Sequence, residues 1–237
     1  IPQHWQWRAA AGLVIIAAII GLAGFWISPD RLGIADWDYY FSLHTIYRQT
    51  IVQYHQLPLW NPYTCGGTAG IGDPEFPLFT PTFLLELVFG IPRGLRLAIY
   101  FAVITGGLGM LAFAKRLRLS VWAGLLAALV YMFSTVNLLE IVEGHVNIFA
   151  AMWLPWLWWG WLGAYRNPTR WRILLVGLFF ALTFLQAGIY LLVYTFLALG
   201  LVILLCKQKL RALKITTLAG LWALGLVAIK LVPVLFW

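Results

Sequence analysis

Charged residues are scarce in this sequence, and acidic residues are the scarcest. Of the 237 residues, 10% are charged and only eight are Asp or Glu, against 62% apolar residues and a mean hydropathy of +0.87. So little polar surface cannot cover a water-soluble globule of this length. The composition therefore excludes an ordinary soluble domain and predicts an all-α, polytopic membrane protein.

Several patterns that carry chemistry are also missing. The sequence has no phosphate-binding P-loop, no GxSxG stretch and no Cys/His spacing typical of a metal site. It also lacks a Lys/Arg stripe with interleaved aromatic residues, so the pI of about 9.7 does not indicate a nucleic-acid partner. Cys65 and Cys206 fall on opposite sides of the membrane in the topology derived below, so they cannot form a disulfide. The sequence thus requires no cofactor, although it is compatible with a divalent cation.

Long apolar runs supply the predicted membrane spans. The first, from Ala9 to Ile27, would be about 29 Å long as a helix, which nearly matches a hydrocarbon core of roughly 30 Å. We retain it as a helix because no convincing small-residue cleavage site follows it. The fifth and sixth spans are expected to form a hairpin that turns at residues 186–188. Seven crossings are predicted: Ala9–Ile27, Leu95–Ala114, Val121–Thr135, Asn147–Tyr165, Ile173–Leu185, Ile189–Cys206 and Ile215–Val232.

The distribution of charge predicts the orientation. If the apolar stretch Phe76–Phe89 does not cross the membrane, eleven of the sixteen basic residues fall on the inner side. A crossing there would move ten of those eleven outside, against the inward bias of Lys and Arg. We therefore expect a cytoplasmic N-terminus and an interfacial or re-entrant hairpin at Phe76–Phe89 on the outer face. All eight acids then lie outside: Asp30, Asp36, Asp38, Asp73, Glu75, Glu86, Glu140 and Glu143.

The segment between the first two spans, residues 28–94, is far longer than a connection requires, and long loops often carry function. It opens with "GIADWDYYFSLHTIYRQT", in which aromatic residues recur at three- and four-residue spacing. This spacing predicts an amphipathic helix at the level of the lipid headgroups, with Trp37, Tyr40, His44, Tyr47, Ile51 and Tyr54 on one face. Because the chain lacks an initiating Met and stops after an apolar span, we expect residues 1–237 to form one transmembrane module of a longer protein.

Two acids stand two residues apart at the start of this predicted helix. Asp36 occupies the expected N-cap position, and Asp38 in the first turn favours the helix dipole, so capping alone can explain both. Side chains at i and i+2 of a helix point about 200° apart, so the pair is not expected to share one metal ion. Alternatively, Asp36 stands outside the helix, faces a cavity and acts as a general base. Both readings stay open on the sequence.

The combined pattern resembles the integral-membrane glycosyltransferases of the GT-C superfamily, and most closely the YfhO-like bacterial membrane proteins. The resemblance rests on an inner-starting first helix, "ADWDYY", the Leu-Pro-x-Trp-Asn-Pro stretch at Leu57–Pro62, "PEFPLFTPTFLLELVFG", "VEGHVN" and "LVP". It implies transfer of a sugar from a polyprenyl-phosphate donor to an acceptor on the outer face of the bacterial cytoplasmic membrane. Asp36, with Asp38 as second choice, matches the family position of the general base.

The implied reaction also needs cations or hydrogen-bond donors where the phosphate leaving group gathers charge. Candidates on the outer face are Arg48, His145 and Lys230. Each also has a simpler interpretation. Arg48 would face the lipid headgroups, and His145 would be a polar loop residue. Lys230 would extend from the end of a span to the membrane interface. Trp60 and Asn61 are candidates for shaping the substrate pocket, or they fold the loop.

Two other function classes fit the composition. A non-catalytic membrane subunit of a larger assembly would use the outer segment as a docking surface and would tolerate loss of both aspartates. A lipid or sugar transporter is expected to have broken helices and ionisable residues deep in several spans, whereas Lys230 is the one such residue here. The partners that we expect are a lipid-linked sugar donor and membrane lipids, and the sequence identifies no partner subunit.

Overall fold

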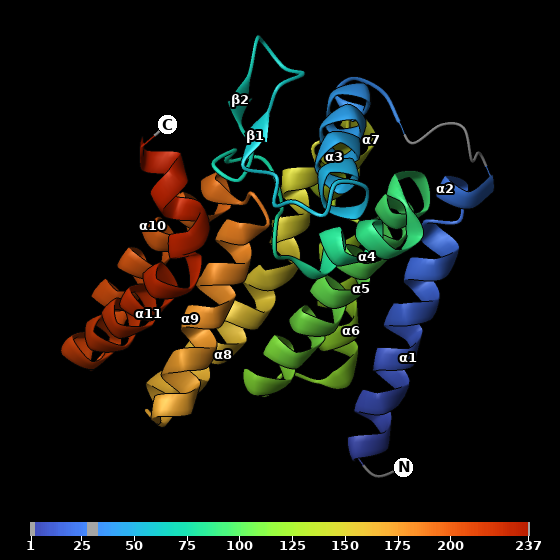
Figure 1. Cartoon of the computed structure of the whole chain (residues 1–237). Coiled ribbons are helices and arrows are strands. Elements are labelled where there is room, and N and C mark those ends of the chain that lie inside the picture. The colour runs from blue at the N-terminus through green and yellow to red at the C-terminus, as the bar shows by residue number, and fades with distance from the viewer. Residues whose placement is uncertain (1–2, 28–32, 237) are drawn as a thin grey trace.

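The computed structural model describes residues 3–27 and 33–236 and is almost entirely helical (Figure 1). Asp30, which we expected on the outer side, lies outside the described residues. The two short strands pair antiparallel, with Trp60 opposite Ala69 and Asn61 opposite Thr68. The elements are α1 (Gln3–Gly21), α2 (Gly24–Ile27), α3 (Trp37–Val52), β1 (Trp60–Asn61), β2 (Thr68–Ala69), α4 (Pro81–Phe89), α5 (Ile91–Arg116), α6 (Val121–Met132), α7 (Thr135–Glu143), the 3-10 helix η1 (Val146–Trp153), α8 (Leu154–Arg166), α9 (Arg170–Leu185), α10 (Ile189–Leu205) and α11 (Lys209–Phe236).

Three helical segments of the described chain are long and apolar enough to cross a membrane: Ile91–Arg116, Val121–Glu143 and Lys209–Phe236. The second of these bends at Phe133, after which Ser134 caps α7 by accepting a hydrogen bond from the next turn. Helices α8, α9 and α10 are shorter, with 13, 16 and 17 residues. The structure therefore supports a helical membrane protein, and the predicted hairpin turn at residues 186–188 lies between α9 and α10 as expected.

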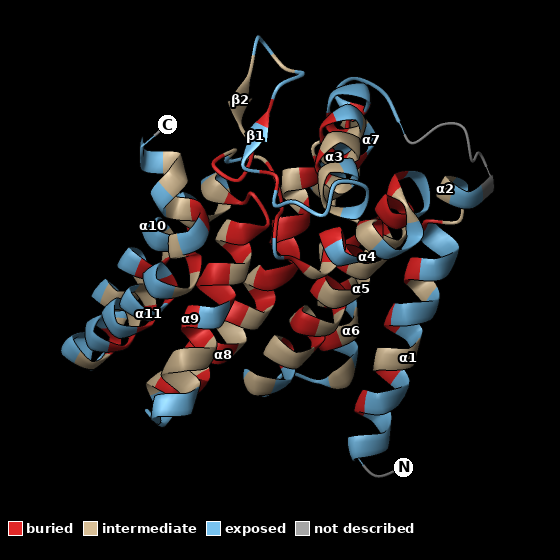
Figure 2. Ribbon diagram, in the orientation of Figure 1, coloured by how far each residue is buried: buried red, intermediate tan, exposed pale blue. Residues whose placement is uncertain are grey.

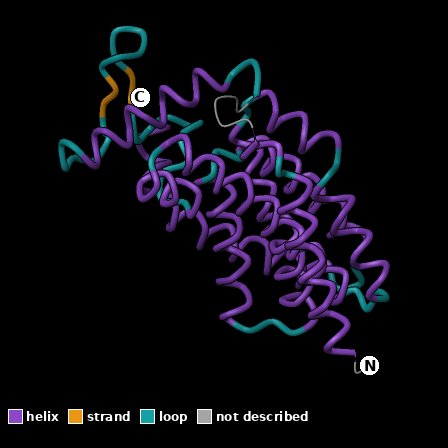
Figure 3. The backbone as a smooth tube through the Cα atoms, turned by 90° about the vertical axis from the view of Figure 1, so that its right-hand side faces the viewer, coloured by secondary structure: helices purple, strands orange, loops and turns teal. Residues whose placement is uncertain are grey.

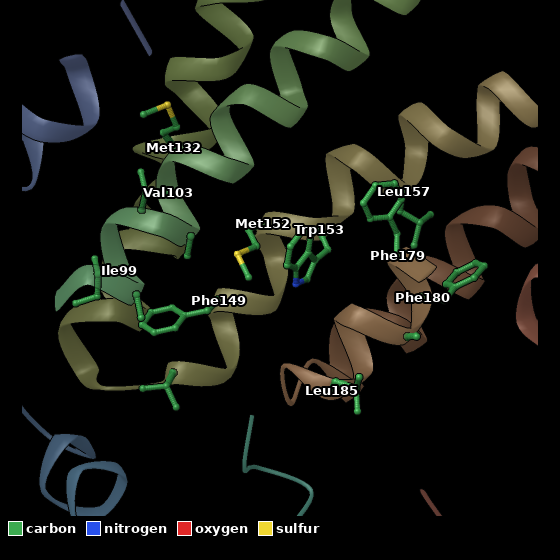
Figure 4. Close-up of a cluster of buried hydrophobic side chains, with 14 of the residues drawn as sticks. Ile99, Val103, Met132, Phe149, Met152, Trp153, Leu157, Phe179, Phe180 and Leu185 are labelled. Carbon is green, nitrogen blue, oxygen red and sulfur yellow. The ribbon is translucent and has the colours of Figure 1, made fainter. Parts of the chain in front are cut away.

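The core of the molecule runs through the central helices, where buried residues concentrate (Figure 2). In Figure 4, Ile99 and Val103 of α5 lie beside Phe149 and Met152 of η1, while the cluster continues to α9. Small residues let the helices approach closely, as is usual in membranes. A Cβ atom at Gly107, for example, would collide with Met132 of α6.

The two ends of the helical bundle differ in chemistry. In Figure 1 the N-terminus and the α8–α9 turn lie at the lower end, and α3, α7 and the strands lie at the upper end. The side view separates the N-terminus from the strands in the same way (Figure 3). Every described acid belongs to α3, α4, α7 or the segments beside them. The acids therefore gather toward the end that we expect outside.

Helix α3 has the predicted aromatic face, but that face contacts protein rather than lipid headgroups. Tyr47 is fully buried, and its ring centroid lies 4.0 Å from that of Phe76. The buried residues beneath α3 come from the chain that follows the strands: Ile71, Phe76, Leu78 and Phe83. We expected this face to contact lipid headgroups. It packs instead on protein, because residues 71–83 fold back under the helix. Tyr54 lies beyond the end of α3 and is exposed.

The apolar stretch Phe76–Phe89 does not form one straight helix. Only its second part is helical, as α4, which begins at Pro81 and is capped by Thr80. Nine residues rise about 14 Å, less than half the thickness of a hydrocarbon core. Helix α4 packs against the following helix, α5. The stretch is therefore too short to cross a membrane as one helix, and its placement as an interfacial or re-entrant hairpin on the outer face stays a prediction.

Candidate active site

Asp36 occupies the N-cap position of α3 but does not cap it. Its side chain forms no hydrogen bond with the backbone of the helix. Its Oδ2 atom lies instead 3.2 Å from Nε2 of His145. The residue before it, Ala35, has a φ of +58°, a conformation that non-glycine residues rarely adopt outside functional or tightly constrained sites. A capping role therefore does not account for Asp36, whose side chain contacts His145 instead of the helix backbone.

Backbone contacts hold Asp36 against the end of α7. The Asp36 amide donates to the carbonyl of Glu143 at 2.9 Å, and the indole N–H of Trp37 donates to the carbonyl of Ile141 at 3.0 Å. Gly144 ends α7 with a φ of +90°, and a Cβ atom there would lie 2.5 Å from the Trp37 amide nitrogen. Only glycine tolerates both this conformation and this close approach. The local sequence Glu-Gly-His thus brings the two segments together.

Three carboxylates surround the imidazole of His145. Nδ1 of His145 lies 2.5 Å from Oε2 of Glu140 and 3.8 Å from Oε2 of Glu143, while Nε2 faces Asp36. The four side chains are roughly one-third to one-half exposed, so solvent and ligands can reach them. We call Asp36, Glu140, Glu143 and His145 the carboxylate–histidine cluster. A protonated ring can donate to the carboxylates on both sides.

The carboxylates favour the protonated form of His145. Burial lowers the pKa of this imidazole, but the hydrogen bond and charge of Glu140, together with Asp36, outweigh burial and raise the pKa above its ordinary value of 6.5. An imidazolium between two carboxylates orients both of them and offsets part of their mutual repulsion. The protonated ring therefore holds Asp36 in a fixed direction.

The same cluster has the composition of a cation site. The donor atoms of Glu140, Glu143 and His145 all lie within 4.8 Å of one another. Two carboxylates and one imidazole suit a divalent transition metal ion such as Zn²⁺ or Mn²⁺. Binding such an ion would require His145 to be neutral and to turn one ring nitrogen toward it. The cluster could therefore either bind a divalent cation or transfer protons without a metal ion.

An open groove lies at the same end of the molecule as the cluster. Tyr39 of α3 lines it and follows Asp36 by three residues in the sequence. Trp60 and Asp73 contribute an indole ring and a carboxylate, and Val234 closes the groove from α11. Aromatic faces with a few polar groups are typical of ligand sites. The groove provides room for a ligand near the first turn of α3, although the members of the carboxylate–histidine cluster do not line it.

The structure separates the remaining candidates from this cluster. Asp38 is exposed and forms no hydrogen bond or ion pair with any residue in ranges 3–27 and 33–236. Arg48 donates from Nε to the carbonyl of Glu86 at 2.9 Å and from Nη2 to that of Leu87 at 3.2 Å. These bonds satisfy the C-terminal end of α4. Arg48 therefore holds α4 against α3.

Lys230 and Asn61 also form hydrogen bonds that stabilise the segment between α3 and α4. Nζ of Lys230 is fully buried and donates to the carbonyls of Pro74 at 3.1 Å and Phe76 at 2.6 Å. Asn61 is fully buried, and its side chain bonds Thr64 at 2.8 Å within the turn. Trp60 is the exception, because its ring is 46% exposed and lines the groove.

Comparison of the chain with protein-family models, with curated proteins and with solved structures finds no match. The resemblance to the GT-C superfamily therefore stays a prediction.

Glu140 and Glu143 are the members of the cluster that the sequence did not identify as site residues. A signal was present, because both lie on one helix face three residues apart and His145 follows within two residues. In a chain with only eight acids, three ligating side chains within six residues are conspicuous. Their convergence on Asp36, however, depends on how α7 packs against the start of α3.

Proposed function

We propose that the chain is the membrane module of a glycosyltransferase that moves a sugar from a polyprenyl-phosphate donor to an acceptor hydroxyl on the outer face of the membrane. The observation that carries this proposal is the contact of Asp36 with His145. Asp36 stands at a helix N-cap, makes no cap hydrogen bond and instead contacts a histidine, at the end of the molecule that also carries an open groove. This carboxylate is arranged for chemistry rather than for helix stability.

In the proposed reaction Asp36 is the general base. Its carboxylate takes the proton of the acceptor hydroxyl while the hydroxyl oxygen attacks the anomeric carbon of the sugar. The bond between that carbon and the phosphate oxygen breaks, and the phosphate leaves with the electron pair. His145 positions Asp36, and Glu140 holds the imidazole from its other side. In the alternative state with a neutral His145, a divalent cation held by Glu140, Glu143 and His145 would replace the ring proton and would neutralise charge on the leaving phosphate.

The membrane placement belongs to the same proposal. Seven crossings, a cytoplasmic N-terminus and residues 28–94 on the outer face of a bacterial cytoplasmic membrane place the cluster where lipid-linked sugars are used. The separation of acids from the basic turn at the other end of the bundle supports this orientation. The contacts of Lys230 argue against a transporter, because its charge is engaged by backbone carbonyls of the outer segment.

The decisive experiment compares Asp36→Asn with Asp38→Asn in the full-length protein at equal membrane abundance. Incorporation of labelled sugar from polyprenyl-phosphate hexose donors into membrane glycans is measured. Removing a general base typically lowers the rate about 10² to 10⁴-fold, and we expect this loss for Asp36→Asn. Asp38→Asn is the matched control and should retain activity, because Asp38 touches neither the cluster nor the groove.

Asp36→Asn should also fold normally, since the side chain makes no cap hydrogen bond and Asn can still contact His145. Wild-type activity in both variants would contradict the proposal. It would favour a non-catalytic subunit, with Asp36 serving to dock the outer segment on α7.

A further inference from the structure

Four arginines from four helices meet at the end of the molecule opposite to the carboxylate–histidine cluster. Their guanidinium groups are linked through helix-end carbonyls: Arg166 Nη1 donates to the carbonyl of Arg116 at 2.7 Å, and Arg211 Nη2 donates to that of Arg166 at 3.1 Å. We call the group the arginine cluster. Its members are Arg116 at the end of α5, Arg166 at the end of α8, Arg172 at the start of α9 and Arg211 at the start of α11.

The fold holds these side chains in fixed positions. The guanidinium carbon of Arg116 lies 3.9 Å from the ring centroid of Trp159, and its Nη1 donates to the Trp159 carbonyl. A Cβ atom at Gly163 would collide with the Arg116 guanidinium, so this group fits only because residue 163 is glycine. Arg172 donates to the carbonyl of Asn167 at 3.0 Å. The cluster is therefore built into the packing of the helices.

No carboxylate in residues 3–27 and 33–236 forms an ion pair with the arginine cluster. The sequence has no acidic residue between positions 87 and 139 and none after Glu143, and these stretches supply all four helices. The positive charges of Arg166 and Arg172 act on Arg116, which is half-buried and only partly screened by solvent. Nε of Arg211 is buried and has no hydrogen-bond partner. Like charges are thus held together without a counter-charge from the described chain.

Capping of helix ends explains part of this arrangement. Guanidinium groups satisfy the last carbonyls of α5 and α8 and interact favourably with their dipoles. Each arginine has five N–H donors, however, and the carbonyl contacts use only one or two of them. The remaining donors and four positive charges suit an anionic group with several acceptor oxygens. Phosphate is the group that arginine forks recognise best.

The position of the cluster indicates where that phosphate comes from. Arg116 ends one of the helices that are apolar enough to cross a membrane, and Arg211 lies two residues after the start of another. The neighbouring side chains Trp171 and Leu210 are 80% and 82% exposed, which places apolar surface beside the charges. An interface of this kind lies at the depth of lipid headgroups. We propose that the arginine cluster binds the headgroup phosphate of an anionic phospholipid in the leaflet at this end of the membrane.

The test measures lipid binding by the purified full-length protein in neutral detergent, by native mass spectrometry. Phosphatidylglycerol and phosphatidylcholine of the same chain length are the probes. Binding of phosphatidylglycerol should weaken about fivefold in Arg211→Gln and about fivefold in Arg166→Gln. Arg170→Gln is the matched control. It removes the same charge from the same end of the molecule, but Arg170 is exposed and makes no hydrogen bond with the arginine cluster in the described chain.

Arg116 is left unchanged, because its substitution would also remove the contact with Trp159 that packs α5 against α8. Folding of each variant is checked by its thermal unfolding midpoint without added lipid. Equal binding of the two lipids by the wild type, or equal losses in Arg170→Gln and Arg211→Gln, would overturn the proposal. Competition by glycerol 1-phosphate as strong as that by the intact lipid would also overturn it, since the site would then bind free phosphate.

Discussion

His145 is the residue on which the candidate active site depends, because it contacts carboxylates from two distant segments. Its two ring nitrogens face Asp36 and Glu140 at 3.2 Å and 2.5 Å. A histidine in an outer loop could equally have been an isolated polar residue, as the sequence allowed. The contacts instead make it the link between the start of α3 and the end of α7, so its protonation should affect stability as well as activity.

We predict that the stabilising effect of His145 decreases as the pH rises. Its folded pKa is raised above 6.5, so the ion pairs contribute fully below about pH 6.5 and are lost as the pH rises through the folded pKa. Because the side chain is 32% exposed, the effect should be at most about 1 kcal/mol. Thermal unfolding midpoints of the wild type and His145→Gln should differ more at about pH 6 than at about pH 8.5.

His4→Gln is the matched control for this measurement. His4 is exposed on α1 and makes no ion pair with the residues that the structure describes, so its substitution should give no such pH-dependent gap. A gap between wild type and His145→Gln that stays constant with pH would contradict the predicted role of protonation.

At the scale of elements, the segment from α3 to α4 is a folded layer rather than a loose connection. A buried contact of 2.6 Å joins His44 of α3 to Glu86 of α4, and Arg48 closes the end of α4 from the same face of α3. Breaking a buried pair of this kind by removing one partner is costly, which makes the two helices a unit. This layer positions both the groove and the first residues of α3.

Lys230 fastens this layer to α11, and we predict that Lys230→Met destabilises the protein by about 1 to 3 kcal/mol. The substitution leaves the carbonyls of Pro74 and Phe76 without the donor that they share. Thermal unfolding in detergent measures the loss, and limited proteolysis should cleave more readily near Pro74. Lys214→Met removes an exposed lysine from the same helix and should have little effect. Equal stability of the two variants would show that the hydrogen bonds from Lys230 to Pro74 and Phe76 contribute little to the stability of the protein.

For the whole molecule, we predict that the end carrying the acids faces outward. Cys65 is exposed in the turn between β1 and β2, so a membrane-impermeant thiol reagent should label it in intact cells. A cysteine introduced at Asn167, in the exposed turn between α8 and α9, should be labelled only after permeabilisation. Cys65→Ser serves as the background for that second measurement. Labelling at position 167 in intact cells would invert the proposed topology.

The sequence was sufficient for the class of fold and for several local elements. Helix α3, the turn at residues 186–188 and the folded-back stretch before α5 were all predicted, because each depends on spacing, glycine and proline within a short window. It also identified Asp36 and His145 as separate candidates. The sequence did not predict that Asp36 and His145 contact each other. Arg48 and Lys230 were phosphate-binding candidates because of their charge, but both donate to backbone carbonyls.

By itself, then, the sequence determined that the chain is helical, and its 62% apolar and 10% charged residues predicted a membrane protein, with which three apolar helices of the described chain are consistent. Only the tertiary structure decided which polar groups meet. Helices that are apolar on nearly every face carry little information about their neighbours, so the pairing of Asp36 with His145 and the convergence of the four arginines depend on helix packing. Small residues such as Gly144 and Gly163 permit those contacts, because a side chain there would occupy the space of the partner.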